Sequence, residues 1–522
     1  MIDFVAKYDQ ERLGIAKHAQ RTPEKPALIV NDVIVTYKDL DRRSNALANG
    51  LLKLGIKPGD RVCILMKNGP EILQAWTAAG KLSVIPIALN YNFKEDELSY
   101  IINDSKSKAL IFAKEFREVI DGVMNKITLS PFTFISAGAV LSPQVLDLTE
   151  ILAASPETPP AVEPDPIHMP SALIYTAGTT GKPKGVYKKS KGRLNALLGC
   201  AYNFESTYDD IHLVAGPLYH AAPYAWAALS LLLGNTVVIM SKFDGENFLR
   251  LIDKHHVTTT LLVPTMLNRI VHLPEEVKER YDVSSLRVMV TGGEAFPFPL
   301  KQEVIKYFER CRLYEFYGGT ETSVVTCLRP EEQLKRAGSC GSAVMGADIK
   351  LLDENKDEVG VGEMGVLYVK SPFLMDGYYN NHDAARACSH GEYLTVGDIA
   401  KKDEDGYFYI VDRAVDVIIS GGVNIYPAEI EAVLHEHPGV YDVSIIGAKD
   451  LEWGERVVAY IVREQDSEIT QEEVVAYVGR RLASYKKPKE VIFLKEIAYS
   501  ASGKQLKRVL REDYSRRYAI KQ

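Results

Sequence analysis

The chain has 522 residues, of which 46% are hydrophobic and 25% charged, and its formal net charge is −7. This length exceeds the size at which one hydrophobic core stops growing, so at least two domains are expected. The acidic balance argues against nucleic acid as the main partner, because binding to a phosphate backbone requires a dominant basic surface.

The N-terminal segment and the cysteines both favour a cytoplasmic protein. The first twelve residues contain five charged side chains, where a secretory signal peptide requires an uninterrupted apolar run. The six cysteines form no Cys-x-x-Cys pair, which fits a reducing compartment and offers neither a zinc site nor a disulfide framework.

Apolar runs alternate with helical patterns over roughly the first 340 residues. This alternation predicts doubly wound α/β sheets in a large N-terminal domain. The clearest strands are expected at 61–66, 109–112, 172–175, 236–239, 259–263 and 286–290, and the clearest helices at 40–54 and 70–81.

One stretch, residues 211–240, contains no Asp, Glu, Lys or Arg and on that count is long enough to span a bilayer. Two prolines and the turn Gly234-Asn235 interrupt it. A buried helix over 225–233 followed by a buried strand over 236–240 explains the same residues, so no transmembrane segment is expected.

The pattern changes twice in the last third of the chain. Short strands and glycine turns at 349–352, 365–369 and 407–410 predict a β-rich subdomain over about 340–412. From 413 to 522 a small α+β domain is expected, with helices at 427–435 and 470–482 and strands at 440–446 and 456–462. The large domain therefore covers residues 1–412, with the boundary near 412–416.

The loop after the strand at 172–175 combines glycines, hydroxyls and lysines, which suits a polyphosphate. Glycines let backbone N–H groups approach closely, hydroxyls donate hydrogen bonds, and lysines supply positive charge. It is not a Walker loop, because only two residues separate its first Gly from the Gly-Lys pair and Pro183 follows. The candidate phosphate ligands are Thr176, Gly178, Thr179, Thr180 and Lys184.

The string from Tyr175 to Val186 closely resembles the phosphate loop of the acyl-adenylate-forming superfamily. That superfamily includes acyl- and aryl-CoA synthetases, adenylation domains of peptide synthetases and luciferases. The resemblance covers essentially the full chain, because later motifs appear in the family's order, and it implies a small mobile C-terminal domain. Ala177 stands where the family more often has Ser, which removes one possible phosphate donor.

The resemblance implies the nucleotide-binding residues. In Tyr314–Glu321 it implies that Tyr317 stacks on adenine, that Thr320 donates to phosphate and that Glu321 holds Mg²⁺, for which oxygen ligands are suited. An acceptor-only carboxylate likewise suits the vicinal diol of the ribose. The other implied nucleotide contacts are Gly292, Gly293, Glu294, Glu315, Phe316, Asp398 and Arg413.

His220, in Leu218–Ala222, resembles the family's histidine that lines the acyl pocket and moves between catalytic steps. A lone histidine among apolar residues is otherwise a structural one. The neighbouring Tyr219, Tyr224 and Trp226 suggest an apolar, partly aromatic pocket for an acid that the sequence does not identify.

Segment 412–431 resembles the region that joins the two domains in the family, about which the smaller domain rotates. Val415 stands where the hinge is usually Asp or Lys. Gly421 and Gly422 resemble the border of the pantetheine channel, although a structural turn remains the alternative. Lys504 is implied to be catalytic, in a partial match that lacks the customary Pro-Arg before it.

The basic residues Lys486, Lys487, Lys507 and Arg508 are candidates for the CoA phosphates, with a solvated surface as the alternative.

Together these motifs predict an AMP-forming acid:CoA ligase that uses ATP, Mg²⁺ and coenzyme A, in fatty acid or aromatic acid metabolism. The alternatives are an enzyme that loads a carrier-protein phosphopantetheine, a luciferase-type oxygenase and a non-catalytic nucleotide-binding protein. An amino-acid adenylation domain is disfavoured, because residues 218–226 lack the acidic residue that pairs with a substrate ammonium. A protein without catalysis would be expected to lose Lys504, Glu321 or Asp398. The oligomeric state cannot be read from the sequence.

Overall fold

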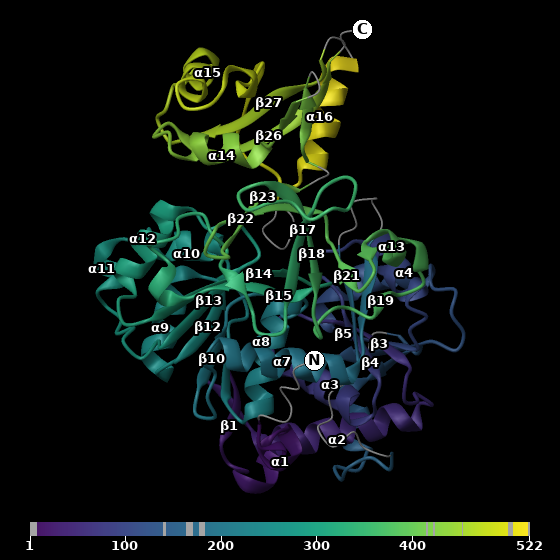
Figure 1. The fold of residues 1–522 in the computed structure, drawn as a ribbon. Helices are drawn as coiled ribbons and strands as arrows, with labels where there is room; N and C mark the ends of the chain where they lie inside the picture. The colour runs from purple at the N-terminus through teal and green to yellow at the C-terminus, as the bar shows by residue number, and fades with distance from the viewer. Residues whose placement is uncertain are drawn as a thin grey trace. The chain divides into compact units, whose positions relative to one another are not determined.

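The computed structural model describes residues 8–138, 142–162, 171–176, 183–413, 416–420, 423–450, 453–499 and 505–519. The chain divides into two compact units, whose elements are labelled in Figure 1. The first comprises Met1–Ala337, Gly341–Asp348 and Val369–Leu394, and the second Gly338–Cys340, Ile349–Tyr368 and Thr395–Gln522. The boundary expected near residues 412–416 stays a prediction.

The first unit contains a nine-stranded sheet in the order β16-β15-β14-β13-β12-β10-β11-β1-β2, parallel from β1 to β14 and antiparallel at both edges. The strands are β1 (Pro26–Val30), β2 (Val33–Thr36), β10 (Ile211–Val214), β11 (Thr236–Ile239), β12 (Thr259–Leu262), β13 (Val288–Gly292), β14 (Arg312–Gly319), β15 (Ser323–Leu328) and β16 (Ser342–Ala343).

Helices cover both faces of this sheet. α9 (Gly245–His255), α10 (Pro264–Val271) and α12 (Phe298–Tyr307) bury apolar side chains against one face, beside β10, β12 and β13 in Figure 1. α8 (Ala221–Leu233) packs on the other face, where Trp226 lies among side chains of β12, β13 and β14. The first unit therefore has the doubly wound arrangement that the sequence predicts.

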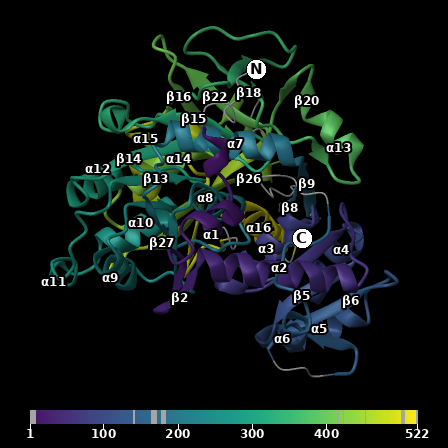
Figure 2. The same cartoon turned by 90° about the horizontal axis from the view of Figure 1, so that it is seen from below.

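A second parallel sheet has the order β4-β3-β5-β6-β7. Along β3, Val62 and Ile64 face one core and Cys63 and Leu65 face another, because successive side chains of a strand point to opposite sides. The first core is closed by α2 and α3, which lie side by side in Figure 2. The elements are β3 (Arg61–Leu65), β4 (Ile85–Ala88), β5 (Ala109–Ala113), β6 (Thr133–Ala137), β7 (Val145–Asp147), α2 (Tyr37–Lys53), α3 (Pro70–Lys81), α4 (Glu95–Asp104) and α5 (Arg117–Met124).

A third, three-stranded antiparallel sheet has the order β19-β9-β8 and carries the phosphate-loop motif. Its strands are β8 (Ala172–Thr176), β9 (Lys184–Lys188) and β19 (Gly377–Tyr378). The remaining helices of this unit are α1 (Ile15–Arg21), α6 (Leu148–Ala153), α7 (Ser190–Asn203), α11 (Glu275–Lys278) and α13 (His382–Ala387), and its remaining strands are β20 (Ser389–His390) and β21 (Tyr393–Leu394).

The second unit combines short antiparallel strands with a small α+β layer. Most of β17 (Asp348–Leu352) and β18 (Met364–Lys370) belongs to it, together with β22 (Asp398–Lys402) and β23 (Phe408–Arg413). A further sheet, β25-β24-β27-β26 with β28 beside β27, is covered by helices. These elements are β24 (Ile418–Ser420), β25 (Val423–Ile425), β26 (Val440–Asp450), β27 (Gly454–Arg463), β28 (Glu490–Leu494), α14 (Pro427–His435), α15 (Gln471–Gly479) and α16 (Lys507–Ala519).

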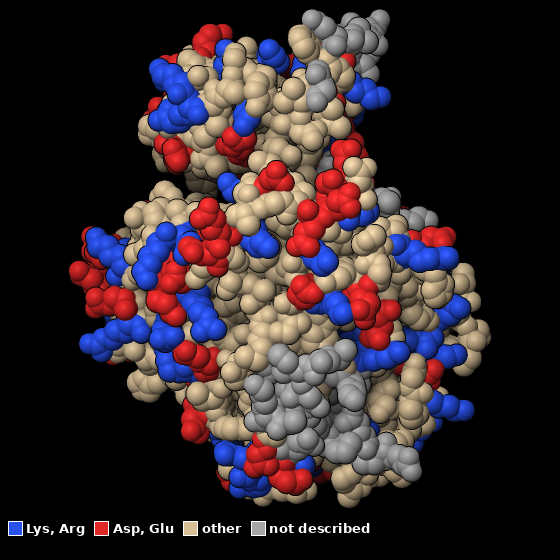
Figure 3. All heavy atoms as spheres, in the orientation of Figure 1, with Lys and Arg blue, Asp and Glu red and all other residues tan. Residues whose placement is uncertain are grey.

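The apolar stretch 211–240 is divided as predicted, into β10, α8 and β11. Gly234 ends α8 in a left-handed conformation with φ 84°, which reverses the chain into β11. Among the described residues, no helix is long and apolar enough to cross a membrane. On the face shown in Figure 3, basic and acidic side chains are interspersed over the region where Figure 1 labels α9 and α12.

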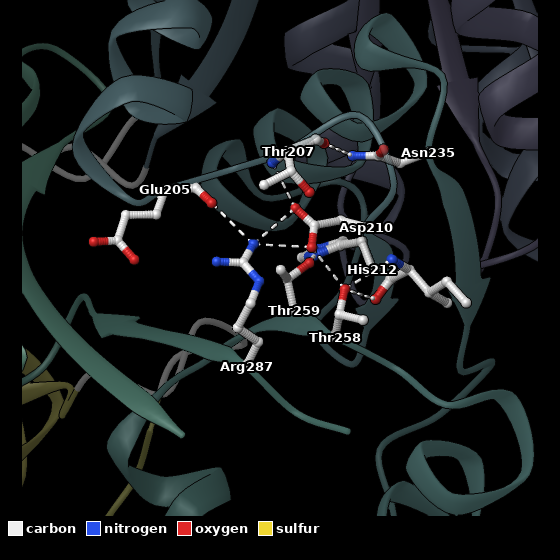
Figure 4. A network of polar contacts seen from close by, with 9 residues as sticks. Glu205, Thr207, Asp210, His212, Asn235, Thr258, Thr259 and Arg287 are labelled. Atoms are coloured by element: carbon white, nitrogen blue, oxygen red, sulfur yellow. Dashed lines mark hydrogen bonds and ion pairs between the residues drawn. The ribbon is translucent and has the colours of Figure 1, made fainter. Parts of the chain in front are cut away.

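The buried carboxylate of Asp210 links the segments that lead into β10, β12 and β13, at the N-terminal edge of the large sheet (Figure 4). Asp210, with only 3% of its side chain exposed, accepts hydrogen bonds from the Thr207 N–H, the Thr258 hydroxyl and the Arg287 guanidinium at 2.7–2.9 Å. Thr258 and Arg287 directly precede β12 and β13. The network therefore fixes where these strands begin relative to β10.

His212 lies beside this network, with Nδ1 3.1 Å from the Thr259 hydroxyl. Burial lowers the pKa of His212 to about 4, and the nearby Asp210 opposes this shift only in part. The imidazole is therefore neutral at neutral pH, and the folded chain resists its protonation.

His212 should make the fold acid-sensitive. Because its pKa falls from 6.5 to about 4 on folding, the unfolded chain binds a proton that the folded chain does not over that range. The free energy of unfolding should drop by about 3 kcal/mol as the pH falls through this window. His212→Asn keeps a polar atom near the Thr259 hydroxyl and should flatten the pH dependence, measured by urea unfolding. The exposed His256, which has the left-handed conformation that Asn tolerates, gives the control His256→Asn; equal flattening in both variants would contradict the assignment.

Candidate functional site

The two ends of the predicted phosphate loop face each other across the β8–β9 hairpin. Thr176, the last residue of β8, is paired with Lys184, the first residue of β9. Gly178, Thr179 and Thr180 lie between them, outside the described residues. The hairpin therefore places the Thr176 hydroxyl and the Lys184 ammonium at the two ends of the loop, a place that we call the mouth of the loop.

The carboxylate of Glu321 lies at this same place. Its Oε1 accepts hydrogen bonds from the Thr176 hydroxyl at 3.5 Å and from the Tyr378 hydroxyl at 3.1 Å. The Lys184 ammonium lies 5.5 Å from the centre of the Tyr378 ring. Burial, followed by the charge of Glu321, raises the pKa of Tyr378, so its hydroxyl stays a donor. The structure thus brings together Thr176, Lys184 and Glu321, which the sequence singled out. It adds Tyr378, which the sequence did not single out.

Glu321 stands in a tight turn between β14 and β15. Gly319 pairs with Ser323, which has a left-handed φ of 59°, and the Gly319 N–H donates to the Thr322 hydroxyl at 3.0 Å. A Cβ on Gly318 would lie 2.0 Å from the Ser323 carbonyl oxygen, so only glycine fits there. The turn is also tied from outside, because the Met375 N–H donates to the Glu321 carbonyl at 2.7 Å. Thr320 and Glu321 are therefore presented on a short, constrained turn.

The predicted adenine segment ends β13 beside β14. Gly292 pairs with Phe316, and a Cβ on Gly292 would lie 2.6 Å from the Phe316 carbonyl oxygen. Gly293 has φ 88°, a conformation that favours glycine. The backbone here can therefore run against β14 more closely than a side chain would allow. Glu294 follows the two glycines and is partly buried.

Neighbouring side chains of β14 have different surroundings. Phe316 belongs to an aromatic cluster, with its ring stacked 5.8 Å from that of Trp226. Glu315 accepts a hydrogen bond from the buried Lys301 of α12 at 2.6 Å, and its pKa is raised by burial against the opposing effect of that lysine. Tyr317 is partly buried. The side chains of Glu315 and Phe316 are engaged within the fold, so any nucleotide contact of these two residues would involve the backbone.

Aromatic side chains surround the start of α8. His220 is the residue before this helix, and its ring lies 4.3 Å from that of Tyr219, which in turn meets Tyr91 edge-on at 4.9 Å. Trp76 stacks on Tyr224 at 3.6 Å. Burial raises the pKa of Tyr219. The rings therefore pack together around the start of α8, and the acyl pocket that the sequence suggested here stays a prediction.

The buried hydroxyl of Thr291, the residue before Gly292, has no hydrogen-bond partner in the described part of the chain. A buried donor left without a partner is costly unless a ligand or water completes it. Thr291 therefore marks a polar point at the carboxyl end of β13, where open α/β sheets bind their ligands.

In the second unit, the predicted ribose pair is adjacent. Asp398 and Arg413 face each other between β22 and β23, with Oδ1 3.3 Å from Nε, and only 9% of the Asp398 side chain is exposed. The neighbouring Asp412 accepts from the Ala428 N–H at the start of α14 at 3.0 Å. Burial raises the pKa of Asp412, and the positive charge of Lys507 opposes this increase.

The basic residues considered for CoA are largely engaged in ion pairs. Lys486 contacts Glu429 at 2.6 Å, Lys507 contacts Glu431 at 2.8 Å and Arg508 contacts Glu512 at 3.0 Å. These pairs favour a structural role for Lys486 and Lys507. Val415, Gly421, Gly422 and Lys504 lie outside the described residues.

Comparisons with known proteins cover nearly the whole chain. Residues 15–379 match the family model of the AMP-binding enzymes and residues 429–504 that of the AMP-binding enzyme C-terminal domain. A long-chain-fatty-acid–CoA ligase of Mycobacterium tuberculosis is 35% identical, over 93% of this chain and 94% of its own. A feruloyl-CoA synthase of Amycolatopsis is 33% identical, over 95% and 98%.

Solved structures agree with these relatives. The o-succinylbenzoate CoA synthetase of Bacillus subtilis, in complex with its acyl-adenylate intermediate, superposes with a TM-score of 0.83 at 31% identity, covering 95% of this chain and 97% of its own. The same enzyme, in complex with ATP and magnesium ion, gives 0.82 at 30% identity, covering 95% and 98%. Matching over this length and at this identity, the chain belongs to the AMP-binding enzyme family.

Proposed function

We propose that this protein is an AMP-forming acid:CoA ligase, which converts a carboxylic acid, ATP and CoA into acyl-CoA, AMP and pyrophosphate. The observation that carries the proposal is the grouping of Glu321, Thr176 and Lys184 at the mouth of the phosphate loop. A carboxylate for a hard cation, a hydroxyl donor and an ammonium group are what a magnesium-bound polyphosphate requires.

The residues present fit Mg²⁺. Glu321 offers carboxylate oxygens, and the side chains that donate to it in the described part of the chain are the hydroxyls of Thr176 and Tyr378, which are oxygen groups as well. Within the described ranges, no three His, Cys, Asp or Glu side chains are close enough to hold a metal alone. One protein carboxylate completed by phosphate oxygens is the usual way in which Mg²⁺ is held at nucleotide sites. When bound, the ion would supply neutralisation of the phosphate charge.

In the first half-reaction, a carboxylate oxygen of the acid attacks the α-phosphorus of ATP. The new C–O–P linkage forms, the bond to the bridging oxygen of the β-phosphate breaks, and pyrophosphate leaves with that electron pair. We assign the phosphates to Thr176, Thr320 and Lys184. In phosphoryl and nucleotidyl transfer, positioning and charge neutralisation supply most of the catalysis. The backbone of Gly292 and Gly293 and the ring of Tyr317 receive the adenine.

The second half-reaction joins the acyl group to CoA. The CoA thiolate attacks the acyl carbon of the acyl-adenylate, a thioester forms, and AMP leaves with the electrons of the broken C–O bond. We assign ribose binding to Asp398 with Arg413, and the charge-stabilising lysine of the first step to Lys504. Gly421 and Gly422 are assigned to the pantetheine path.

The proposal includes a large domain of residues 1–412, with a β-rich part from about 340, and a smaller domain of residues 413–522 that rotates between the two steps. Val415, a β-branched residue with a stiff side chain, stands at the position of the pivot. We assign the acid to the region of His220, Tyr219 and Thr291. The aromatic rings of this region suit an acid that has an apolar or ring-containing group.

The direct test is a panel of acids scored by AMP release with and without CoA, with the products identified by mass spectrometry. Fatty, aryl and alicyclic acids are offered with free CoA and, in parallel, with a phosphopantetheinylated carrier protein. Acyl-CoA together with AMP from at least one acid supports the ligase. Acyl transfer only to the carrier, or ATP cleavage that no acid stimulates, would contradict it.

Glu321→Gln removes the metal-binding charge while keeping the side-chain size. Acid-dependent pyrophosphate exchange should fall by about a hundredfold or more, as for loss of one well-placed charge-stabilising group, and the Mg²⁺ concentration for half-maximal rate should rise. The exposed Glu392 of the same unit provides the control Glu392→Gln, with an unchanged Mg²⁺ curve. An unaltered curve in Glu321→Gln would remove Glu321 from the metal site.

Gly292→Ala tests the adenine segment. Because the added methyl group would meet the Phe316 carbonyl at 2.6 Å, the backbone must shift, and KM for ATP should rise by about tenfold with a smaller effect on KM for CoA. The matched control is Gly192→Ala in α7, where a Cβ meets nothing within 4 Å. Equal KM values for ATP in the variant and the parent would place the adenine elsewhere.

Lys504→Ala separates the two half-reactions. Acid-dependent pyrophosphate exchange should be lost by about a hundred- to a thousandfold, whereas thioester formation from supplied acyl-adenylate should persist. The exposed Lys489 serves as the control, since Lys489→Ala should leave both half-reactions intact. Equal loss of both half-reactions in Lys504→Ala would rule out the assigned role.

A further inference from the structure

Lys188, the last residue of β9, is a cation beside the Glu321 turn that the sequence did not single out. Its ammonium donates to the Ser323 hydroxyl and, at 3.0 Å, to the Phe373 carbonyl. The Ser323 hydroxyl donates to the same carbonyl at 3.0 Å. Ser323 closes the turn that carries Glu321, so Lys188 is bound to the structure that presents this carboxylate.

In the part of the chain that the structure describes, the ammonium of Lys188 donates to two neutral groups, the Ser323 hydroxyl and the Phe373 carbonyl. It makes no ion pair with any carboxylate in the described ranges, whereas the next residue, Lys189, lies 3.6 Å from Asp376. Burial lowers the pKa of Lys188 to about 8, and the charge of Glu321 is the strongest influence that opposes this shift. Lys188 is therefore a mostly charged group near neutral pH, and Glu321 is its main opposite charge.

Two positive charges near one carboxylate repel each other. A cation that binds Glu321 must enter the field of Lys188, which partial burial leaves less screened than a surface charge. ATP reverses the balance, because its phosphates bring several negative charges to which Lys188 is attracted. Lys188 thus disfavours binding of the free divalent cation at Glu321 and favours binding of the same cation in complex with the phosphates of ATP.

We propose that Lys188 couples metal binding at Glu321 to the nucleotide, by opposing the free divalent cation and attracting the phosphates of the magnesium–ATP complex. This inference rests on the metal and polyphosphate site of the proposed function. It makes Lys188 a positioning and electrostatic residue, distinct from those that touch the reacting atoms.

The test uses the full chain and binding measurements that need neither acid nor CoA. Mn²⁺ binding without nucleotide is followed by the electron paramagnetic resonance of the free ion, and MgATP binding by calorimetry. Lys188→Gln keeps a hydrogen-bond donor but removes the charge, Lys188→Arg keeps both, and Lys189→Gln removes the neighbouring exposed charge.

The proposal predicts opposite changes in Lys188→Gln: Mn²⁺ binding tightens by about fivefold or more, and MgATP binding weakens by a similar factor. Lys188→Arg and Lys189→Gln should stay within about twofold of the parent on both measurements, because each retains the charge at residue 188. The opposite signs matter, because a lysine that only anchors the turn would weaken both ligands on removal.

Unchanged or weakened Mn²⁺ binding in Lys188→Gln would overturn the inference. Absence of Mn²⁺ and MgATP binding in the parent protein would overturn it together with the polyphosphate site. Opposite shifts in a protein that ligates no acid to CoA would uphold the role of Lys188 and overturn only the proposed ligase reaction.

Discussion

The position of one carboxylate, that of Glu321, is the constraint on which the candidate site depends. A charged group can be held in a partly buried place only if polar partners and covalent geometry fix it there. Here the fixing comes from three directions: the glycine-dependent turn between β14 and β15, the hydroxyls of Thr176 and Tyr378, and the bond from Met375 to the Glu321 backbone. Segments about 145 residues apart in sequence thereby meet at one oxygen atom.

The large sheet supplies the frame for this turn. β13 and β14 are parallel neighbours in the interior of this sheet, so their carboxyl ends reach the same edge and place Thr291–Gly293 beside the segment that leads to Glu321. At the opposite edge, Asp210 fixes the starts of the strands through Thr258 and Arg287. The polar network at one end thus helps to set the register on which the ligand-binding end relies.

The elements that could be predicted from the sequence are those with a strong local pattern. α3 begins and ends where its proline and periodicity indicate, as does α14. β13 starts two residues later than expected and α15 ends three residues earlier, at Gly479, since apolar pattern alone does not define the ends of an element. The long motifs predicted Thr176, Lys184 and Glu321 as one site, which the structure brings together.

The contributions of Tyr378 and Lys188 could not be predicted, because they arise from long-range pairing. Tyr378 reaches Glu321 only because the two-residue strand β19 pairs with β9, and such a short strand has no signature of its own. In the sequence Lys188 is one of two adjacent lysines, and only its contacts with Ser323 and Phe373 in the folded chain distinguish it from Lys189. Likewise, the sequence around Glu315 does not indicate that its hydrogen-bond partner is Lys301 of α12.

The relatives show how one frame can serve different acids. Their names specify a long-chain fatty acid, ferulate and 2-succinylbenzoate as substrates, at similar identity to this chain. In this chain the proposed nucleotide side is built from glycines, hydroxyls and charges, whereas the region at the start of α8 is built from packed aromatic rings. Under the proposed function, the choice of acid depends on this aromatic region, and the ATP chemistry depends on the nucleotide side.

A crystal structure of the protein with ATP and Mg²⁺ tests the central claim most directly. If Glu321 holds the metal, a Mg²⁺ ion is expected about 2.1 Å from a Glu321 carboxylate oxygen, with the phosphates of ATP beside Thr176 and Lys184. A nucleotide-bound ion with no contact to Glu321, whose Oε1 remained hydrogen-bonded to Thr176 and Tyr378 as in the free protein, would contradict it.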